Sequence, residues 1–155
     1  MKIYFKAIAL AMAVSLMANV ACKKEERCSV HPEPFRFSII DNQAGTDLLK
    51  NGTFDAEKIG IHYFYNNERH DLIINNEIEP LSQYTELKVI QLPMISLTGR
   101  TNIFYLELNT ELTDTLEIVV EKEAMPDCDY HPYTMAKHNG TNLTTGTGGV
   151  YLIRK

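Results

Sequence analysis

The chain of 155 residues has no tryptophan, only three cysteines and no surplus of basic residues. Its 15 Lys and Arg stand against 20 Asp and Glu, a formal net charge of −5, and this balance argues against nucleic-acid binding, which depends on cations that neutralise phosphates. The sequence contains no repeat, no low-complexity tract and no long stretch with helical spacing, which argues against a solenoid, a coiled coil or a disordered chain. It also lacks G-x-S-x-G, H-E-x-x-H and phosphate-binding glycine loops, so it predicts no catalytic residue, no metal and no cofactor.

The first 21 residues have the pattern of a secretory signal. Lys2 and Lys6 form a cationic start, an apolar run covers 7–17, and the small residues Val20 and Ala21 precede Cys22. The alternative is a short membrane helix, but the apolar run is shorter than the roughly 20 residues that span a bilayer. The sequence therefore predicts a signal peptide over 1–21, a polar tether over 22–27 and one domain over 28–155.

The residues around the cleavage site resemble those of bacterial lipoproteins. Asn19-Val20-Ala21-Cys22 resembles a lipobox, although asparagine stands where leucine is usual, and residues 23–26 (KKEE) resemble the lysine and acidic-pair signal of surface-exposed Bacteroidota lipoproteins. The resemblance implies that Cys22 is acylated and that the protein is anchored in the outer membrane at the cell surface, with the membrane as one partner. The alternative is a solvated charge run after an ordinary cleavage site.

Two cysteines remain once Cys22 is assigned to lipid. Cys28 and Cys128 would lie in an oxidising compartment, where a pair of cysteines predicts one disulfide. Both also begin a C-x-x-H sequence, with His31 and His131, so that the four side chains could form a Cys₂His₂ zinc site. Two free thiols are the third possibility, and the disulfide is favoured.

Apolar residues alternate with polar ones along most of the remaining chain. This period of two indicates strands with one buried and one solvated face, as in antiparallel sheets. Strands are expected in the segments 35–40, 59–65, 72–74, 87–92, 103–108, 116–121 and 150–153. Seven or eight short strands favour an all-β, antiparallel two-sheet β-sandwich, with an open β-barrel as the alternative.

The connecting segments contain turn residues. Turns are predicted at residues 66–69, 75–76, 127–130 and 146–149, and a single helical turn at 54–58. After the first strand, Asp41 is expected to cap a turn in which Gly45 has a positive φ, in preference to a calcium loop, since no glutamate follows at the required place.

Two further resemblances concern the domain itself. Residues 35–49 (FRFSIIDNQAGTDLL) resemble the opening of a family of sandwich-type Bacteroidota lipoproteins of uncharacterised function, which brings no chemistry with it. Asp114-Thr115-Leu116 resembles the O-glycosylation site of exported proteins in the same bacterial group, which implies Thr115 as a possible glycan acceptor.

For function, the pattern favours a lipid-anchored envelope protein that acts as a non-catalytic binding or structural module. Its partner would be an envelope protein or a glycan, because seven tyrosines of the domain could form an exposed aromatic platform. Three exposed tyrosines on one sheet face would favour binding. The alternatives are a small envelope hydrolase with a histidine/carboxylate site, favoured by a pocket that contains such a pair, and a Cys/His metal-binding protein. His62 is expected on the face of its strand opposite Ile61 and Tyr63, and His70 in a turn.

Overall fold

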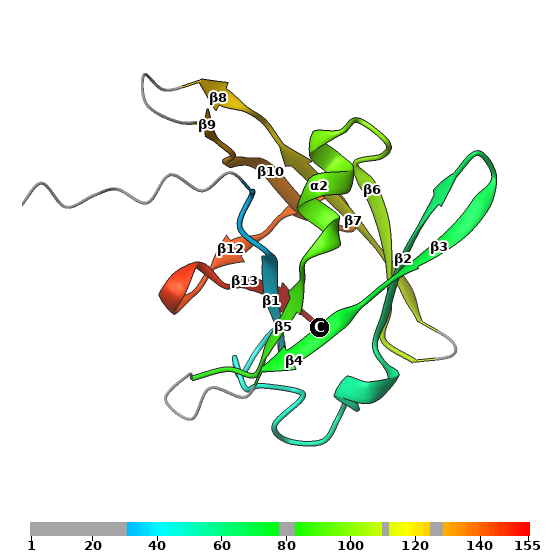
Figure 1. Ribbon diagram of the computed structural model, residues 1–155. Coiled ribbons are helices and arrows are strands. Elements are labelled where there is room, and N and C mark those ends of the chain that lie inside the picture. Colours follow the sequence, from blue (N-terminus) through cyan, green and yellow to red (C-terminus); the bar gives the residue numbers. More distant parts are fainter. Residues whose placement is uncertain (1–30, 78–82, 110–111, 125–128) are drawn as a thin grey trace, which may run out of the picture.

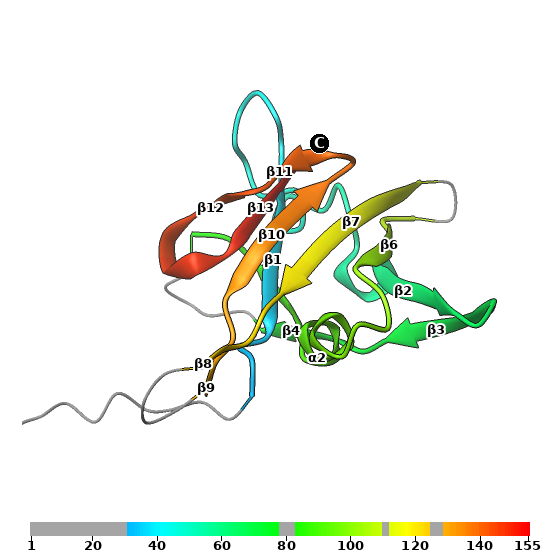
Figure 2. The same ribbon diagram turned by 90° about the horizontal axis from the view of Figure 1, so that it is seen from above.

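The computed structural model describes residues 31–77, 83–109, 112–124 and 129–155, and its strands form two large sheets (Figures 1 and 2). The five-stranded sheet has the order β12-β13-β1-β5-β4 and consists of β1 (Phe35–Ile40), β4 (Ile74–Glu77), β5 (Glu86–Val89), β12 (Thr144–Thr145) and β13 (Tyr151–Arg154). The six-stranded sheet has the order β11-β10-β7-β6-β2-β3 and consists of β2 (Gly60–Tyr65), β3 (Glu68–Leu72), β6 (Ile103–Glu107), β7 (Thr113–Val120), β10 (Tyr133–His138) and β11 (Thr141–Asn142).

The remaining elements are short. A two-stranded ribbon pairs β8 (Glu123–Ala124) with β9 (Asp129–Tyr130), and the helical segments are η1 (Ala56–Lys58), α2 (Gln91–Leu97) and η2 (Thr147–Gly149). The predicted all-β sandwich is thus confirmed. The described residues contain nine strands of four or more residues and four strands of two residues, more than the seven or eight expected.

Two features of the topology did not follow from the strand pattern. The first and last strands, β1 and β13, are neighbours and run parallel, whereas the other pairs in both large sheets are antiparallel. The chain also passes directly from one sheet to the other at two places. Only Ile73 separates β3 from β4, and only Leu143 separates β11 from β12. The sheets are therefore joined covalently at two of their edges.

The core lies between the sheets and consists of the inward-facing residues of the alternating strands. Along β7 every second residue from Asp114 to Val120 is buried, which is the predicted period of two. β1 differs, because Ser38 and Ile40 on its second face are buried as well. The buried hydroxyl of Ser38 has a hydrogen-bond partner there, because it donates to the carbonyl oxygen of Thr85 at 2.7 Å. The fully buried large side chains are Phe35, Phe37, Ile39, Ile40, Ile61, Leu87, Leu92, Phe104, Leu106, Leu108, Leu116 and Ile118.

Most predicted turns are present. Asn66 and Asn67 both have positive φ, as a two-residue hairpin turn requires, and they join β2 to β3. Asp41 accepts hydrogen bonds from the backbone of Gln43 and Ala44, and Gly45 has φ +66°, so this segment is the expected turn. The helical turn after Phe54 is η1, capped by the Asp55 side chain.

Several local predictions were wrong. Glu68 and Arg69, expected in a turn, begin β3, and residues 129–130 of the turn expected at 127–130 form β9, while 127–128 lie outside the described residues. The strand expected to continue through residues 90–92 ends at Val89, and the helix α2 begins at Gln91. Leu92 and Ile95, about one helical turn apart in α2, are buried. Seven residues are too few to display a helical period, which explains the error. Residues 75–76 form part of β4 rather than a turn, because they pair with β5. His70 lies within β3, where its ring stacks on Tyr63 with centroids 5.1 Å apart.

Candidate functional site

The predicted lipid and sulfur sites lie largely outside the described residues. This applies to Cys22, Cys28 and Cys128, so that acylation, the disulfide and the zinc alternative stay predictions. Of the two C-x-x-H histidines, His31 is exposed, and His131 is half-buried with an Nδ1 atom that has no hydrogen-bond partner among the described residues. Within that part of the chain, no group of three His, Cys, Asp or Glu side chains is arranged to hold a metal ion.

Thr115, the predicted glycan acceptor, lies in the middle of β7 and is half-buried. Its backbone N–H donates to the side-chain oxygen of Asn139 at 2.8 Å, and its carbonyl accepts from the backbone of Asn139. Asp114, the residue before it, is buried. The structure therefore places Thr115 on the outer face of a central strand, beside its cross-strand partner Tyr105, and its glycosylation stays a prediction.

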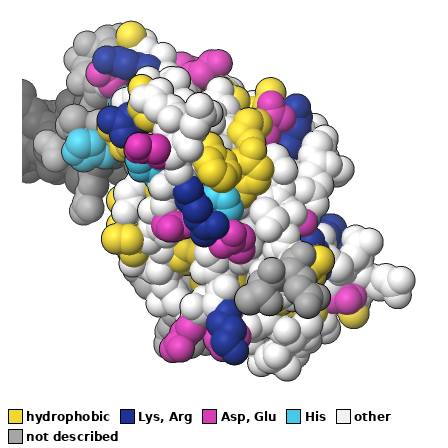
Figure 3. Space-filling view, turned by 90° about the vertical axis from the view of Figure 1, so that its right-hand side faces the viewer, with side chains coloured by type: hydrophobic (Ala, Val, Ile, Leu, Met, Phe, Trp, Pro, Cys, Tyr) yellow, Lys and Arg dark blue, Asp and Glu magenta, His cyan; other side chains and the backbone are white. Residues whose placement is uncertain are grey.

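Residues from three neighbouring strands form a cluster on the outer face of the six-stranded sheet. His62 points to this face, as its position between Ile61 and Tyr63 predicted. Because residues opposite each other on paired strands share a face, the outer-face cluster combines residues of β2, β3 and β6, namely His62, Phe64, Arg69, Asp71, Tyr105 and Glu107. Figure 3 views the side of the molecule on which the β2–β3 hairpin lies, and there hydrophobic side chains gather beside a histidine and groups of both charges.

The Arg69 side chain links β3 to β6. Its guanidinium donates two parallel hydrogen bonds to the Glu107 carboxylate, both at 3.0 Å, and its Nε donates to Asp71 at 2.8 Å. Bidentate pairs of this kind fix the orientation of both groups. Gly60 leaves the room that the carboxylate needs, because a Cβ atom at that position would lie 3.1 Å from Glu107 Oε2.

His62 lies within the cluster and is only 4% exposed. Its ring stacks on Tyr105 with centroids 5.2 Å apart and contacts the edge of Phe64, while its Nδ1 is 3.5 Å from Glu107 Oε1. Burial, and next the nearby Arg69 charge, hold the pKa of His62 below its usual value. The imidazole is therefore neutral at neutral pH and acts as an aromatic and polar support for its neighbours.

The rings of Phe64 and Tyr105 meet edge to face on this surface. Phe64 and Tyr105 stand nearly perpendicular, with centroids 5.6 Å apart and an interplanar angle of 77°, and Phe64 is 49% exposed. An apolar ring face next to fixed donors and acceptors is suited to a ligand with both CH groups and hydroxyls.

The tyrosines themselves do not form the expected platform. Among the described residues, Tyr63 is buried in the core, and Tyr133 and Tyr151 pack with Phe35. The aromatic surface that exists is a mixed one of Phe64, Tyr105 and His62. The criterion of three exposed tyrosines on one face is therefore not met by the described tyrosines.

A second cluster of titratable groups surrounds Asp114, near the beginning of β7. His138 Nε2 is 3.0 Å from Asp114 Oδ2, Lys155 also contacts this oxygen, and Asn139 donates to Asp114 Oδ1 at 2.9 Å. Burial acts to raise the pKa of Asp114, but the hydrogen bonds from Lys155, Asn139 and His138 outweigh it and hold that pKa below its usual value. Asp114 is thus ionised, and its contacts connect β7 with β10 and with Lys155, the last residue of the chain.

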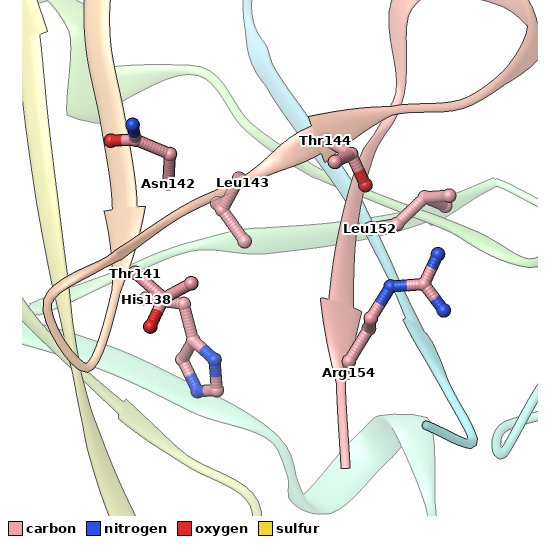
Figure 4. A pocket seen from close by; sticks show the side chains of 7 residues that line it. All are labelled: His138, Thr141, Asn142, Leu143, Thr144, Leu152 and Arg154. Carbon is pink, nitrogen blue, oxygen red and sulfur yellow. The ribbon is translucent and has the colours of Figure 1, made fainter. Parts of the chain in front are cut away.

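A pocket of about 220 Å³ lies beside this second cluster (Figure 4). One side comes from the segment between β10 and β12, and the other from β13; the lining residues are His138, Thr141, Asn142, Leu143, Thr144, Leu152 and Arg154. The pocket thus contains a histidine close to a carboxylate, as the hydrolase alternative requires. However, the polar partners of the His138 imidazole among the described residues are Asp114 and Asn139, and no hydroxyl there hydrogen-bonds to it as a nucleophile would.

Alternation predicts the outward face for His62 in the segment 59–65 and for Tyr105 and Glu107 in the segment 103–108. It makes no such prediction for Arg69, which is expected in a turn, or for Asp71, which lies outside the expected elements. A signal was present in the two asparagines before Glu68, since Asn-Asn suits a two-residue hairpin that would make 68–72 a strand. The pairing of β6 with β2 has no local signal, because 43 residues of chain separate His62 from its register partner Tyr105.

Comparisons with protein families, with curated proteins and with solved structures gave no match to this chain. Among the described residues, no helix has the length and apolar character needed to cross a bilayer. The site is therefore interpreted from its own geometry.

Proposed function

We propose that this chain is a lipid-anchored envelope protein, held in the outer membrane at the cell surface through Cys22, that binds a glycan without catalysis. The anchor is supported by the leader and by the residues that follow Cys22. Binding is supported by one observation above all, the exposed Phe64 ring beside the Arg69–Glu107 pair.

The chemistry of this cluster favours a sugar. A pyranose presents a CH face that packs on an aromatic ring and hydroxyls at its edge that both donate and accept hydrogen bonds. Phe64 and Tyr105 offer the apolar surface, and the paired Arg69 and Glu107 offer donors and acceptors in fixed positions. The cluster holds one guanidinium and two carboxylates, those of Glu107 and Asp71, and this negative balance favours a neutral ligand over an anionic one.

The anchor is tested by mass spectrometry of the protein purified from its native membrane. We expect an N-terminal Cys22 that carries acyl chains and a mass two hydrogens lower than that of the free thiols, which is the signature of a Cys28–Cys128 disulfide. An unmodified N-terminus at residue 23 or beyond would overturn the anchor and the localisation. Intact thiols with bound zinc would support the Cys/His metal alternative instead.

The ligand is tested on a glycan array with the full chain carrying Cys22→Ser, which prevents acylation. We expect binding to a glycan, and Phe64→Ala should weaken it about tenfold because the stacking surface is lost. Tyr130→Ala is the matched control, since Tyr130 is equally exposed but lies in β9, away from the cluster. Binding that is equal in Phe64→Ala and wild type, or no binding to any glycan, would contradict this proposal and leave an envelope protein as the partner.

The hydrolase alternative is favoured by the His138–Asp114 contact beside the pocket of Figure 4. It predicts turnover of ester or amide substrates that disappears in His138→Gln. The binding proposal predicts that the wild-type chain and His138→Gln show the same background rate.

A further inference from the structure

A groove separates the inner side of the β2–β3 hairpin from helix α2. It has a volume of about 560 Å³, within the range of about 300–1,000 Å³ that is common for small-molecule sites, and its lining includes Tyr63, His70, Leu72, Ile90, Met94 and Arg100. Of the hairpin residues that line it, Tyr63, His70 and Leu72 alternate with those of the outer-face cluster, whereas Asp71 borders both. The groove is therefore a separate site, on the opposite face of the same two strands.

The groove is mainly apolar, and part of that apolar surface is open to solvent. Tyr63 and Ile95 form buried parts of its wall, whereas Ile90 is 56% and Met94 39% exposed. An exposed isoleucine and an exposed methionine along one hollow, with a buried apolar wall behind them, indicate a surface that gains free energy when a ligand covers it. Methionine is also suited to ligands of variable shape.

One charged side chain of the groove has no ion-pair partner. Asp71 is the one acid in its lining, and Arg69, which also binds Glu107, pairs with it at 2.7 Å. Arg100 lies over the Tyr65 ring at 5.9 Å and makes no ion pair with any described residue. The groove therefore offers one unpaired guanidinium at the edge of an apolar surface.

A second polar group in the lining also lacks a partner. The side-chain oxygen of Gln91 is inaccessible to solvent, and no described residue donates a hydrogen bond to it. A buried acceptor without a donor carries a desolvation cost, and an ionised carboxylate, which only accepts hydrogen bonds, does not relieve it.

We propose that this groove binds an amphipathic carboxylate, a molecule with an apolar chain and one anionic end. The chain packs on Ile90, Met94 and Leu72, and the carboxylate pairs with Arg100. Guanidinium groups form two parallel hydrogen bonds with carboxylates, so a single arginine can orient such a ligand. An amphiphile with a cationic end should bind less tightly, because it would lie beside Arg100 and the one acid of the lining, Asp71, already has Arg69 as an ion-pair partner.

The test compares three probes with the same ten-carbon chain, namely decanoate, decanol and decyltrimethylammonium, each below its micelle concentration. The full chain with Cys22→Ser is titrated by calorimetry, and the methionine methyl resonances are followed by NMR. We expect decanoate to bind at least tenfold more tightly than the cationic probe and to shift the Met94 methyl resonance, which Met94→Leu identifies.

Two arginine variants make the result specific. Arg100→Gln should weaken decanoate binding about tenfold and leave decanol binding unchanged, because only the anionic end contacts the guanidinium. Arg154→Gln is the matched control, since Arg154 is an exposed arginine in the separate pocket of Figure 4. Residues 1–21 are present in every variant, so any binding of the probes to this apolar segment is the same in each and does not affect the comparison between variants.

The proposal is overturned if the three probes bind equally, if Arg100→Gln leaves decanoate binding unchanged, or if the Met94 resonance does not move. The outcome is independent of the glycan proposal. Phe64→Ala changes the opposite face of the hairpin and should not affect decanoate, whereas Arg100→Gln should not affect glycan binding.

Discussion

Replacing Asp114 with alanine is expected to lower the free energy of unfolding by about 3 kcal/mol or more. The carboxylate is buried and is the common partner of His138, Lys155 and Asn139. Removing one member of a buried ionic cluster costs about 3–5 kcal/mol, because the remaining charges and donors stay desolvated without a partner. Urea denaturation followed by circular dichroism measures the change.

The control for this variant is Asp129→Ala, which removes an exposed carboxylate paired with Lys122. Exposed ion pairs contribute about 0–1 kcal/mol, so this variant should remain close to wild type. A loss of less than 1 kcal/mol in Asp114→Ala would show that the cluster does not stabilise the fold.

The Asp114 contribution should also depend on pH. Its pKa is lower in the folded protein than the ordinary value of about 4, so the stabilisation is present above that value and is lost as pH falls through the lowered pKa. The difference in unfolding free energy between wild type and Asp114→Ala should therefore narrow in acid. A difference that stays constant down to strongly acidic pH would contradict the ionised state assigned to Asp114.

Replacing Phe35 with alanine is expected to cost about 3–5 kcal/mol, the range for truncating a buried phenylalanine. Phe35 is fully buried, and its ring lies 5.1 Å from Tyr151, 5.8 Å from Phe37 and 6.0 Å from Tyr133. It therefore contacts rings of both large sheets, and its loss leaves a cavity at the place where they meet. The same urea experiment measures this loss.

Phe64→Ala provides a matched control, because it makes the same substitution on an exposed phenylalanine. We expect it to change the free energy of unfolding by less than about 1 kcal/mol while it weakens glycan binding. If Phe64→Ala destabilised the fold as much as Phe35→Ala, Phe64 would have a structural role. Weaker glycan binding by Phe64→Ala would then reflect lost stability and not a lost contact with the glycan.

The β2–β3 hairpin supplies both proposed binding sites. Successive residues of a strand point to opposite faces, so His62 and Phe64 contribute to the outer-face cluster while Tyr63 lines the groove. In β3, Arg69 belongs to the outer-face cluster and His70 to the groove, whereas Asp71 borders both. The effect of any substitution in this hairpin should therefore be measured on both glycan binding and decanoate binding.

The amino-acid sequence by itself determined the local features of this protein. The alternation of apolar residues sets which side of each strand is buried, and it placed His62 on the outer face before any tertiary contact was known. The hairpin asparagines, the Asp41 turn and the Gly146–Gly149 segment follow from residues that tolerate or require unusual backbone angles. These features depend on neighbours in the chain, so a local pattern contains them.

Only the tertiary structure decided which strands are neighbours. Alternation is the same whichever strand lies alongside, so nothing local brings Glu107 to Arg69, joins Asp114 to Lys155 or makes β1 and β13 parallel. The helix at residues 91–97 is also a tertiary outcome, because its seven residues are too short to be stable alone and depend on burying Leu92 and Ile95. Both proposed sites are built from such long-range contacts, and this is why their chemistry emerged only from the fold.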